Sequence, residues 1–154
     1  MPSRNEMEMD KYESLKLQNQ LCFPLYSVSN SIIRSYKPLL DELGLTYTQY
    51  LAMMALWEKE RLNEKELGEC LFLKSNTLAP LLKKLQAKGF VSIQKDKKDA
   101  RNIVISLTEE GRMLKDKAIH IPSSIAKTLN ISQQEAMKLY QILHKILEGR
   151  SNKN

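Results

Sequence analysis

The sequence predicts a mainly α-helical protein with a small β-hairpin, an α+β fold in which a winged helix-turn-helix is flanked by helices from both termini. Four leucines recur at i, i+3, i+4 and i+7, which places an apolar stripe on one helix: Leu78, Leu81, Leu82 and Leu85. Apolar residues then alternate with other residues on both sides of the basic loop 94–101, as in a β-hairpin. With 154 residues, no internal repeat and no low-complexity linker, the chain has the size of one domain.

The N-terminal third is expected to be helical after a short tail. Residues 1–11 are polar and of mixed charge, so we expect a disordered tail, and they lack the apolar core of a secretory signal. A long helix is predicted over Tyr12–Tyr36, kinked or restarted at Pro24, because proline has no N–H to donate. A short helix over Pro38–Leu43 follows, and Gly44 ends it.

The central part contains the elements of the helix-turn-helix and its wing. Thr48 is the expected N-cap of a helix that runs to about Lys59. Asn63 caps the next helix, over Glu64–Phe72, and the recognition helix begins near Ser75. In the helix that ends at about Lys59, we expect burial of Leu51, Met54, Ala55 and Trp57. In the hairpin the alternating apolar residues are Val91, Ile93, Ile103, Ile105 and Leu107.

The C-terminal part is again expected to be helical. Thr108 begins a helix that runs to about His120, with an extension past Pro122 left open. Ser132 and Glu135 have the spacing of a capping box and begin the last helix. That helix carries an apolar stripe at helical spacing: Ala136, Leu139, Tyr140, Leu143, Ile146 and Leu147.

The terminal helices carry more apolar residues than a small central module can cover. We therefore expect residues 12–45 and 108–150 to form a helical dimerisation region, and residues 46–107 to form a winged helix-turn-helix DNA-binding module. A two-fold homodimer presents two recognition helices to successive major grooves, which predicts a palindromic operator in double-stranded DNA. The alternative is that both terminal helices fold over their own module.

The charge distribution favours nucleic acid as the partner. With 24 Lys and Arg against 18 Asp and Glu, the net charge is +6, and basic residues fall on the recognition helix and the hairpin tip. Side chains at the start of a recognition helix reach base edges, and an arginine of the wing can be held in position by an acidic residue two positions earlier. The candidate DNA-binding residues are Ser75, Asn76, Thr77, Lys83, Lys84, Lys97, Lys98, Asp99 and Arg101.

Membrane, metal and cofactor functions have little support. The longest apolar run, from Leu51 to Trp57, is far shorter than the ~20 residues that a bilayer requires, so we expect a soluble cytoplasmic protein. The two cysteines are too few for a disulfide scaffold. Together with the two histidines they show no clustered spacing, so neither a metal site nor a cofactor is predicted.

The wing and the helix after it resemble a known family. Asp99-Ala100-Arg101, followed by Ile105-Ser106-Leu107-Thr108-Glu109-Glu110-Gly111, resembles the signature of the MarR family of dimeric transcriptional regulators. Four further segments are similar to its organic hydroperoxide-sensing branch of repressors: 19–23, 36–41, 45–47 and 78–85. The resemblance covers about Leu15 to Pro122, which is most of the chain.

The resemblance implies a redox switch at Cys22. In this branch two tyrosines hold a cysteine of the first helix as a reactive thiol, and Tyr36 and Tyr47 match them. The repressor leaves its operator when organic hydroperoxide oxidises the cysteine. Because no cysteine follows Cys70, the chain resembles the one-cysteine type, in which a small-molecule thiol or a backbone nitrogen resolves the sulfenic acid.

Geometry limits how this switch can be assembled. In a continuous helix the residues from Cys22 to Tyr36 span roughly 21 Å, so their pairing would have to cross a dimer interface. The alternative interpretation is that Cys22 is a small apolar residue. Cys70 is expected to pack on the core-facing stripe of its short helix.

Three positions depart from the simplest picture. Pro24 could start a new helical segment, which would leave Cys22 near a helix N-terminus. Lys74 and Asn76 replace the acidic residue and the glycine that the resemblance associates with the start of the recognition helix. That replacement changes operator preference or strengthens a phosphate contact.

Two other functions remain open from the sequence. A thiol peroxidase also needs an activated cysteine, but it has no use for a basic hairpin and no resolving thiol is evident, so we predict a regulator and not an enzyme. A MarR-type regulator that responds to a small aromatic ligand could bind it among Tyr26, Tyr47, Tyr50 and Trp57. Aromatic residues on helices are more often part of the core.

Overall fold

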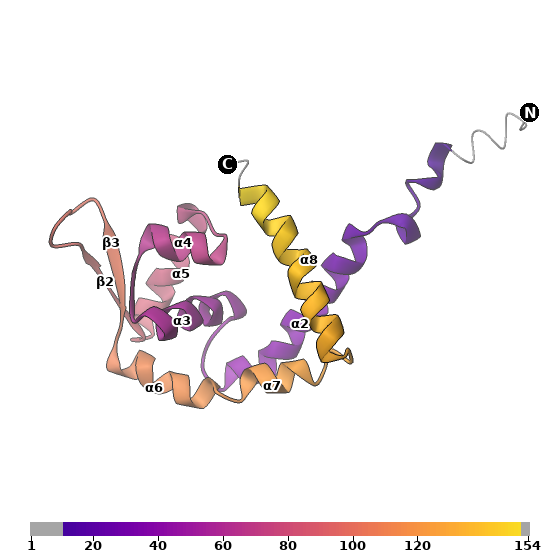
Figure 1. Ribbon diagram of the computed structural model, residues 1–154. Helices are drawn as coiled ribbons and strands as arrows, with labels where there is room; N and C mark the ends of the chain where they lie inside the picture. Colours follow the sequence, from indigo (N-terminus) through magenta and orange to yellow (C-terminus); the bar gives the residue numbers. More distant parts are fainter. Residues whose placement is uncertain (1–10, 152–154) are drawn as a thin grey trace, which may run out of the picture. The chain divides into compact units, whose positions relative to one another are not determined.

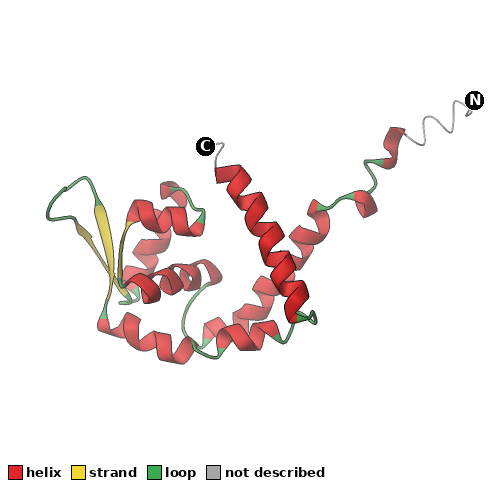
Figure 2. Cartoon of the chain, in the orientation of Figure 1, coloured by secondary structure: helices red, strands yellow, loops and turns green. Residues whose placement is uncertain are grey.

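The computed structural model describes residues 11–151, which form two compact units, one up to Ile121 and one from Pro122 on. Helices dominate both, and one small sheet is present, as the sequence predicts (Figure 1 and Figure 2). The first unit contains η1 (Leu17–Asn19), α2 (Cys22–Asp41), α3 (Tyr47–Lys59), β1 (Arg61–Asn63), α4 (Glu64–Leu71), α5 (Ser75–Ala87), β2 (Val91–Lys95), β3 (Ile103–Leu107) and α6 (Glu109–Ala118). The last two helices are α7 (Ile121–Ala126) and α8 (Gln133–Ser151). The predicted tail over residues 1–11 lies outside the described residues, except for Lys11.

The N-terminal helix is interrupted, so the prediction of one helix over Tyr12–Tyr36 is wrong. Helical backbone at Lys11–Glu13 and the short η1 precede α2, which begins at Cys22. Pro24 lies in the first turn of α2, where N–H groups have no partner within the helix, so the missing N–H breaks no hydrogen bond. The helix thus restarts at Cys22, two residues before Pro24, close to the restart that the sequence left open.

α2 runs through Pro38 to Asp41, so the separate helix predicted over Pro38–Leu43 is also wrong. A proline inside a helix removes one hydrogen bond and crowds the preceding turn. Here the last turn is held by packing, because Leu40 is only 2% exposed. Gly44 follows with a φ of +67°, a conformation that a residue without Cβ adopts at no steric cost.

α3 begins at Tyr47, two residues earlier than predicted. Thr46, and not Thr48, is the N-cap: its hydroxyl accepts from the Gln49 N–H at 3.3 Å, and its N–H donates to Gln49 Oε1 at 3.1 Å. The burial of Trp57 is confirmed, whereas Leu51 and Ala55 are only half-buried and Met54 is 42% exposed. α3 packs against α2, α4, α5, α6 and the sheet, so its buried residues surround most of the helix: Gln49, Tyr50, Ala52, Met53, Leu56 and Trp57.

α4 and α5 form the helix-turn-helix. Asn63 caps α4 as predicted, in a capping box with Glu66. A Cβ on Gly68 of α4 would stand 2.8 Å from the carbonyl oxygen of Leu73 in the turn, so the close approach of the turn to α4 requires glycine. α5 begins at Ser75 as predicted, and the leucine stripe is buried: Leu78, Leu81, Leu82 and Leu85.

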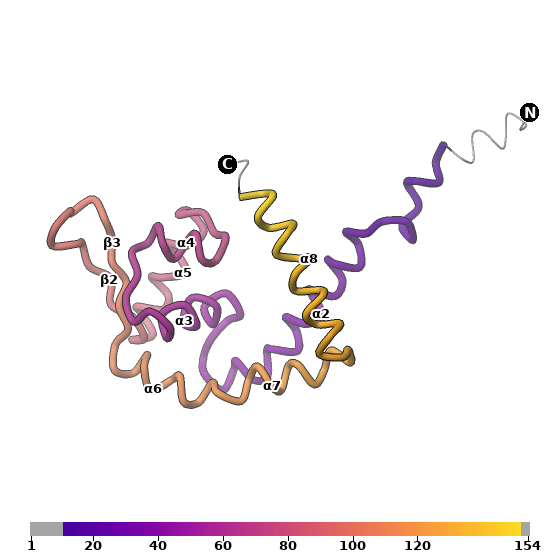
Figure 3. Tube along the Cα trace, in the orientation of Figure 1, coloured from indigo at the N-terminus to yellow at the C-terminus, as the bar shows by residue number. Residues whose placement is uncertain are grey.

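The sheet has three antiparallel strands in the order β1-β3-β2. The predicted hairpin is confirmed, with Val91 opposite Leu107 and Lys95 opposite Ile103. β1 was missed by the sequence analysis because it has only three residues and lies directly before α4. It pairs Leu62, which is buried, with Ile105 of the central strand. Figure 3 follows the chain from α5 into the hairpin. The loop between β2 and β3 extends beyond α4 and α5.

The helix predicted from Thr108 to about His120 is α6, which ends at Ala118. Thr108 caps it: its hydroxyl accepts from the Gly111 N–H at 3.1 Å and donates to the Gly89 carbonyl at 2.6 Å. This cap fixes the junction between the hairpin and α6.

In the second unit, α8 begins with the predicted capping box. The Ser132 hydroxyl accepts from the Glu135 N–H at 3.1 Å, and the Glu135 carboxylate accepts from the Ser132 N–H at 2.7 Å. No residue of α8 is buried. Over residues 11–151, no helix combines the length and the hydropathy that crossing a bilayer demands.

Candidate nucleic-acid interface and redox site

The recognition helix α5 presents its polar side to solvent. Ser75, Asn76 and Thr77 form its first turn and are exposed, as are Lys83 and Lys84 further along. The positive end of the helix dipole and the first-turn N–H groups therefore lie at the surface, where they favour an anion such as phosphate. The buried leucine stripe on the opposite side fixes which face of the helix is offered.

The loop between β2 and β3 is an ordered turn and not a loose connection. The Asp96 N–H donates to the Asn102 carbonyl at 2.8 Å, which extends the hairpin by one pair. The Asp96 carboxylate in turn accepts from the Lys98 N–H at 3.0 Å. Lys97 and Lys98 are exposed at the tip. Two lysines are thus presented from a turn whose backbone is held by side-chain and main-chain hydrogen bonds.

Asp99 and Arg101 form a two-pronged ion pair in the same loop. Arg101 Nε donates to Asp99 Oδ1 at 3.0 Å, Nη2 donates to Oδ2 at 2.9 Å, and the Arg101 N–H donates to Oδ1 at 3.1 Å. Hydrogen bonds from Arg101 lower the pKa of Asp99, so the carboxylate stays ionised. The arginine side chain remains 89% exposed. Since the pair uses two of its five N–H donors, three are left for a phosphate.

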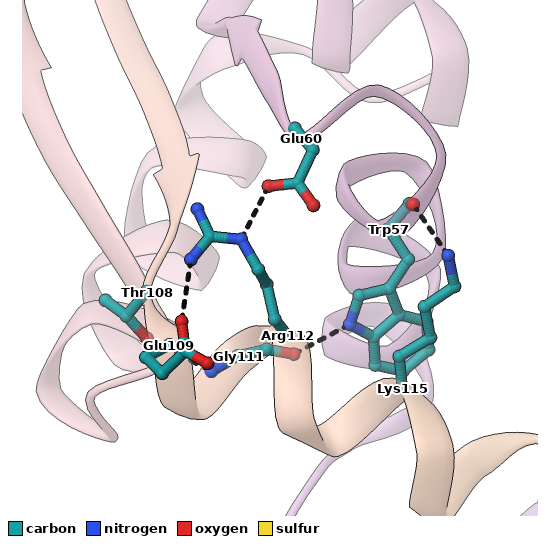
Figure 4. A network of polar contacts seen from close by, with 7 residues as sticks. All are labelled: Trp57, Glu60, Thr108, Glu109, Gly111, Arg112 and Lys115. Carbon is teal, nitrogen blue, oxygen red and sulfur yellow. Dashed lines mark hydrogen bonds and ion pairs between the residues drawn. The ribbon is translucent and has the colours of Figure 1, made fainter.

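The base of the hairpin is tied to α3 and α6 by contacts that the sequence analysis missed (Figure 4). Trp57 Nε1 donates to the Gly111 carbonyl at 2.8 Å, and Lys115 Nζ donates to the Trp57 carbonyl at 3.2 Å. A Cβ on Gly111 would stand 2.1 Å from the Phe90 carbonyl oxygen. The glycine of the family signature is therefore required by the close approach of α6 to the start of β2.

Arg112 adds two ion pairs on the outer side of the same junction (Figure 4). Its Nε lies 2.9 Å from Glu60 Oε2, and its Nη1 lies 3.2 Å from Glu109 Oε2. Glu60 follows α3 with a φ of +62°, and its carbonyl accepts from the Leu107 N–H at 3.1 Å. The hairpin is thus anchored to the rest of the first unit in two places: at the ends of its strands and at α6, the helix that follows it.

Cys22 is exposed and is the first residue of α2. The thiol therefore has the accessibility that oxidation by a peroxide requires.

Tyr36, Tyr47 and Tyr50 form an aromatic cluster between α2 and α3. The ring centroid of Tyr36 lies 4.9 Å from that of Tyr47 and 5.8 Å from that of Tyr50. Burial, with smaller contributions from Tyr47 and Tyr50, raises the pKa of Tyr36 to about 12. Burial also raises the pKa of Tyr47. Both phenols therefore stay protonated near neutral pH and are available as hydrogen-bond donors.

The structure does not bring Cys22 to these tyrosines within one chain. α2 is a continuous helix that contains both Cys22 and Tyr36. At about 1.5 Å per residue, the two lie roughly 21 Å apart along its axis. Any pairing of the thiol with Tyr36 needs a second copy of the chain.

Cys70 does not pack in the core, so that prediction is wrong. Its side chain is exposed, whereas α4 buries Leu67 and Gly68. The stripe that this short helix packs against its neighbours is narrow, and Cys70 falls outside it. Within residues 11–151, no group of three or more His, Cys, Asp or Glu residues is placed to hold a metal ion.

The aromatic residues considered for a ligand pocket fall into different environments. Tyr50 and Trp57 are 2% and 9% exposed and pack edge to face, with ring centroids 6.2 Å apart. Tyr26, by contrast, is 67% exposed. Tyr50 and Trp57 are thus core residues that support α3.

Comparisons with known proteins agree with this geometry. Residues 34–118 match the family model described as transcriptional regulator SarA/Rot. The chain is 43% identical over 145 residues to the organic hydroperoxide resistance transcriptional regulator of Bacillus subtilis (strain 168), covering 94% of this chain and 99% of that protein. It is also similar to the solved structure of reduced AbfR bound to DNA, with a TM-score of 0.75 and 33% identity over 90% of this chain and 96% of that one. Overoxidised AbfR bound to DNA gives a TM-score of 0.74 and 33% identity, covering 90% and 98%; AbfR is from Staphylococcus epidermidis.

Proposed function

This chain belongs to the MarR family of transcriptional regulators, in the branch of the organic hydroperoxide resistance regulators, and from that premise we propose how its residues act. It is a redox-sensing repressor whose homodimer binds operator DNA in the cytoplasm and leaves it when organic hydroperoxide oxidises Cys22. Its relatives are regulators, so oxidation of the thiol is a signal and not a catalytic turnover.

DNA is contacted by two elements of the first unit. The first turn of α5, with Ser75, Asn76 and Thr77, enters the major groove and reads base edges, while Lys83 and Lys84 meet phosphates. The wing contributes Lys97, Lys98 and Arg101, the last held by Asp99. The observation that carries this proposal is the fork between Asp99 and Arg101, which holds a guanidinium at an otherwise solvated tip.

A second copy of the chain covers the exposed apolar residues near both termini. Around the start of α2 these are Leu15, Leu17, Leu21, Phe23, Leu25 and Tyr26. On α8 they are Met137, Leu139, Tyr140, Ile142 and Ile146. A soluble monomer seldom exposes this much apolar side-chain surface. We therefore propose residues 12–45 and 108–150 as the dimerisation region and residues 46–107 as the DNA-binding module.

The switch is assembled across that dimer. Cys22 of one subunit meets Tyr36 and Tyr47 of the partner subunit, whose phenols donate hydrogen bonds to the thiolate. The thiolate sulfur attacks the terminal oxygen of the hydroperoxide and the O–O bond breaks. The sulfur is thereby oxidised to a sulfenic acid, and the peroxide is reduced to an alcohol once the departing alkoxide takes a proton. A small-molecule thiol or a backbone nitrogen then condenses with the sulfenic acid.

The degree of oxidation decides whether DNA is released. AbfR has been captured on DNA in both its reduced and its overoxidised states. Release in this chain therefore belongs to the sulfenic acid or to its condensation product, which changes the contact between the subunits, and not to every oxidised form of sulfur.

One assay tests the proposal against a regulator that responds to an aromatic ligand. A fluorescent duplex selected by the protein from a random-sequence pool is titrated with reduced protein, and anisotropy reports binding. One equivalent of cumene hydroperoxide per thiol should release the duplex, whereas a phenolic ligand such as salicylate should not. Release by salicylate alone would favour the ligand-responsive regulator, and the absence of any selected duplex would contradict DNA binding itself.

A further inference from the structure

Lys88 connects the start of α3 with the end of the recognition helix. It is the C-cap of α5, and its ammonium donates to the Gly44 carbonyl and, at 2.8 Å, to Gln49 Oε1. Gly44 closes the turn after α2. Gln49 is only 3% exposed and belongs to the capping box of α3. A single side chain thus reaches from the recognition helix to the ends of two other helices.

The segment that Lys88 holds also carries a proposed sensor residue. Tyr47 is the first residue of α3 and lies between Gly44 and Gln49 in sequence, with its ring against that of Tyr36. Gln49 Oε1 accepts two hydrogen bonds, one from the Thr46 N–H and one from Lys88. The backbone of Tyr47 lies inside this cap, between Thr46 and Gln49, and the cap is hydrogen-bonded to Lys88.

We infer that Lys88 is a positioning residue that transmits a change at the Tyr36–Tyr47 pair to α5. This inference rests on the proposed redox function, since it needs two states of the tyrosine pair. When oxidation displaces Tyr47, the Gln49 side chain shifts, and the ammonium either follows it or loses one acceptor. Both outcomes change how the end of α5 is held, and α5 carries the residues proposed to read DNA.

A purely static role gives a different result. A lysine near the C-terminus of a helix stabilises that helix through its dipole and through the last carbonyls. Loss of such a contact weakens DNA binding equally in the reduced and the oxidised protein. Transmission instead predicts a change in the ratio of the two dissociation constants, because coupling is a difference between states.

The test compares full-length Lys88→Met, Lys88→Arg and, as a control for one lost charge on an exposed lysine, Lys117→Met. For each protein, the dissociation constant for the selected duplex is measured before and after one equivalent of cumene hydroperoxide. In Lys88→Met the oxidised-to-reduced ratio should fall by about tenfold, within the range usual for coupled sites. The rate of sulfenic acid formation at Cys22 should not change. Lys88→Arg should recover most of the ratio, and Lys117→Met should keep it.

The outcomes separate this inference from the function on which it rests. A wild-type ratio of about one would overturn the redox function and the inference with it. A large wild-type ratio that Lys88→Met preserves would overturn the inference alone. Should Lys88→Met fail to fold, hydrogen exchange on the wild-type protein decides. Oxidation should alter protection at both 44–50 and 88–90, and a change confined to 44–50 would refute transmission through Lys88.

Discussion

Replacement of Gly111 by alanine should destabilise the first unit, because the added Cβ would clash with the Phe90 carbonyl oxygen. The new Cβ would stand 2.1 Å from the Phe90 carbonyl oxygen and 3.2 Å from Leu107 Cδ2. Since the nearest atom is backbone, α6 must move away from the hairpin, which costs ~1–3 kcal/mol for overpacking. The movement also strains the 2.8 Å hydrogen bond from Trp57 Nε1 to the Gly111 carbonyl. A bond of this kind contributes ~1 kcal/mol.

An opposing effect reduces this loss without cancelling it. Alanine is favoured over glycine in a helix by ~1 kcal/mol. The net loss for Gly111→Ala is therefore about 2 kcal/mol in the free energy of unfolding. Gly149→Ala on α8 is the matched control, because a Cβ there meets nothing within 4 Å, so only the helix preference remains.

Urea unfolding followed by tryptophan fluorescence measures both variants, because Trp57 is the only tryptophan and lies at this junction. Gly111→Ala should unfold at lower urea concentration than the wild type, whereas Gly149→Ala should unfold at the same or higher concentration. Gly111→Ala with wild-type stability would refute the close approach of α6 to Phe90.

Further predictions concern DNA contact, the sensor tyrosines and a helix cap. Arg101→Ala should weaken binding to the selected duplex on the order of tenfold and reduce the slope of log affinity against log salt by about one. The dimer should persist in sedimentation, and wild-type affinity would remove Arg101 from the interface. Tyr36→Phe should slow sulfenic acid trapping at Cys22 without affecting binding by reduced protein, and an unchanged rate would argue against the phenol as donor. Burial raises the pKa of Tyr36 to about 12, so the folded state favours the neutral phenol. Its stabilisation is present below pH ~10 and is lost as pH rises towards 12, and alkaline unfolding of Tyr36→Phe should lack this component. Asn63→Ala removes the capping box of α4 and should lower stability by ~1 kcal/mol in the same urea assay, while unchanged stability would mean that the cap contributes little.

Local periodicity predicted the elements of the DNA-binding module well. The leucine stripe of α5, the alternating strands of the hairpin and the caps at Asn63 and Thr108 are short-range patterns, and the structure contains each of them. The boundaries of the helices were predicted less well where packing overrides propensity. α2 continues through Pro38 because burial of Leu40 holds the turn that a proline alone would weaken.

Tertiary contacts account for what the sequence analysis missed. β1 has three residues and gains its strand conformation only by pairing with β3. The exposure of Cys70 depends on which side of α4 faces its neighbours, which helical spacing does not decide for an eight-residue helix. The contacts of Trp57 with Gly111, and of Lys88 with Gln49, join residues 54 and 39 positions apart. No local sequence pattern predicts the hydrogen bond between Lys88 and Gln49.

Release of DNA by Cys22→Ser and Cys70→Ser proteins tests the central claim most directly. Both thiols are exposed, so peroxide can reach either one, and only the separate variants assign the signal. Each variant is bound to the selected duplex, treated with one equivalent of cumene hydroperoxide per thiol and followed by anisotropy. Cys22→Ser should stay bound, whereas Cys70→Ser should be released as the wild type is. A Cys22→Ser protein that still leaves the duplex would contradict the switch.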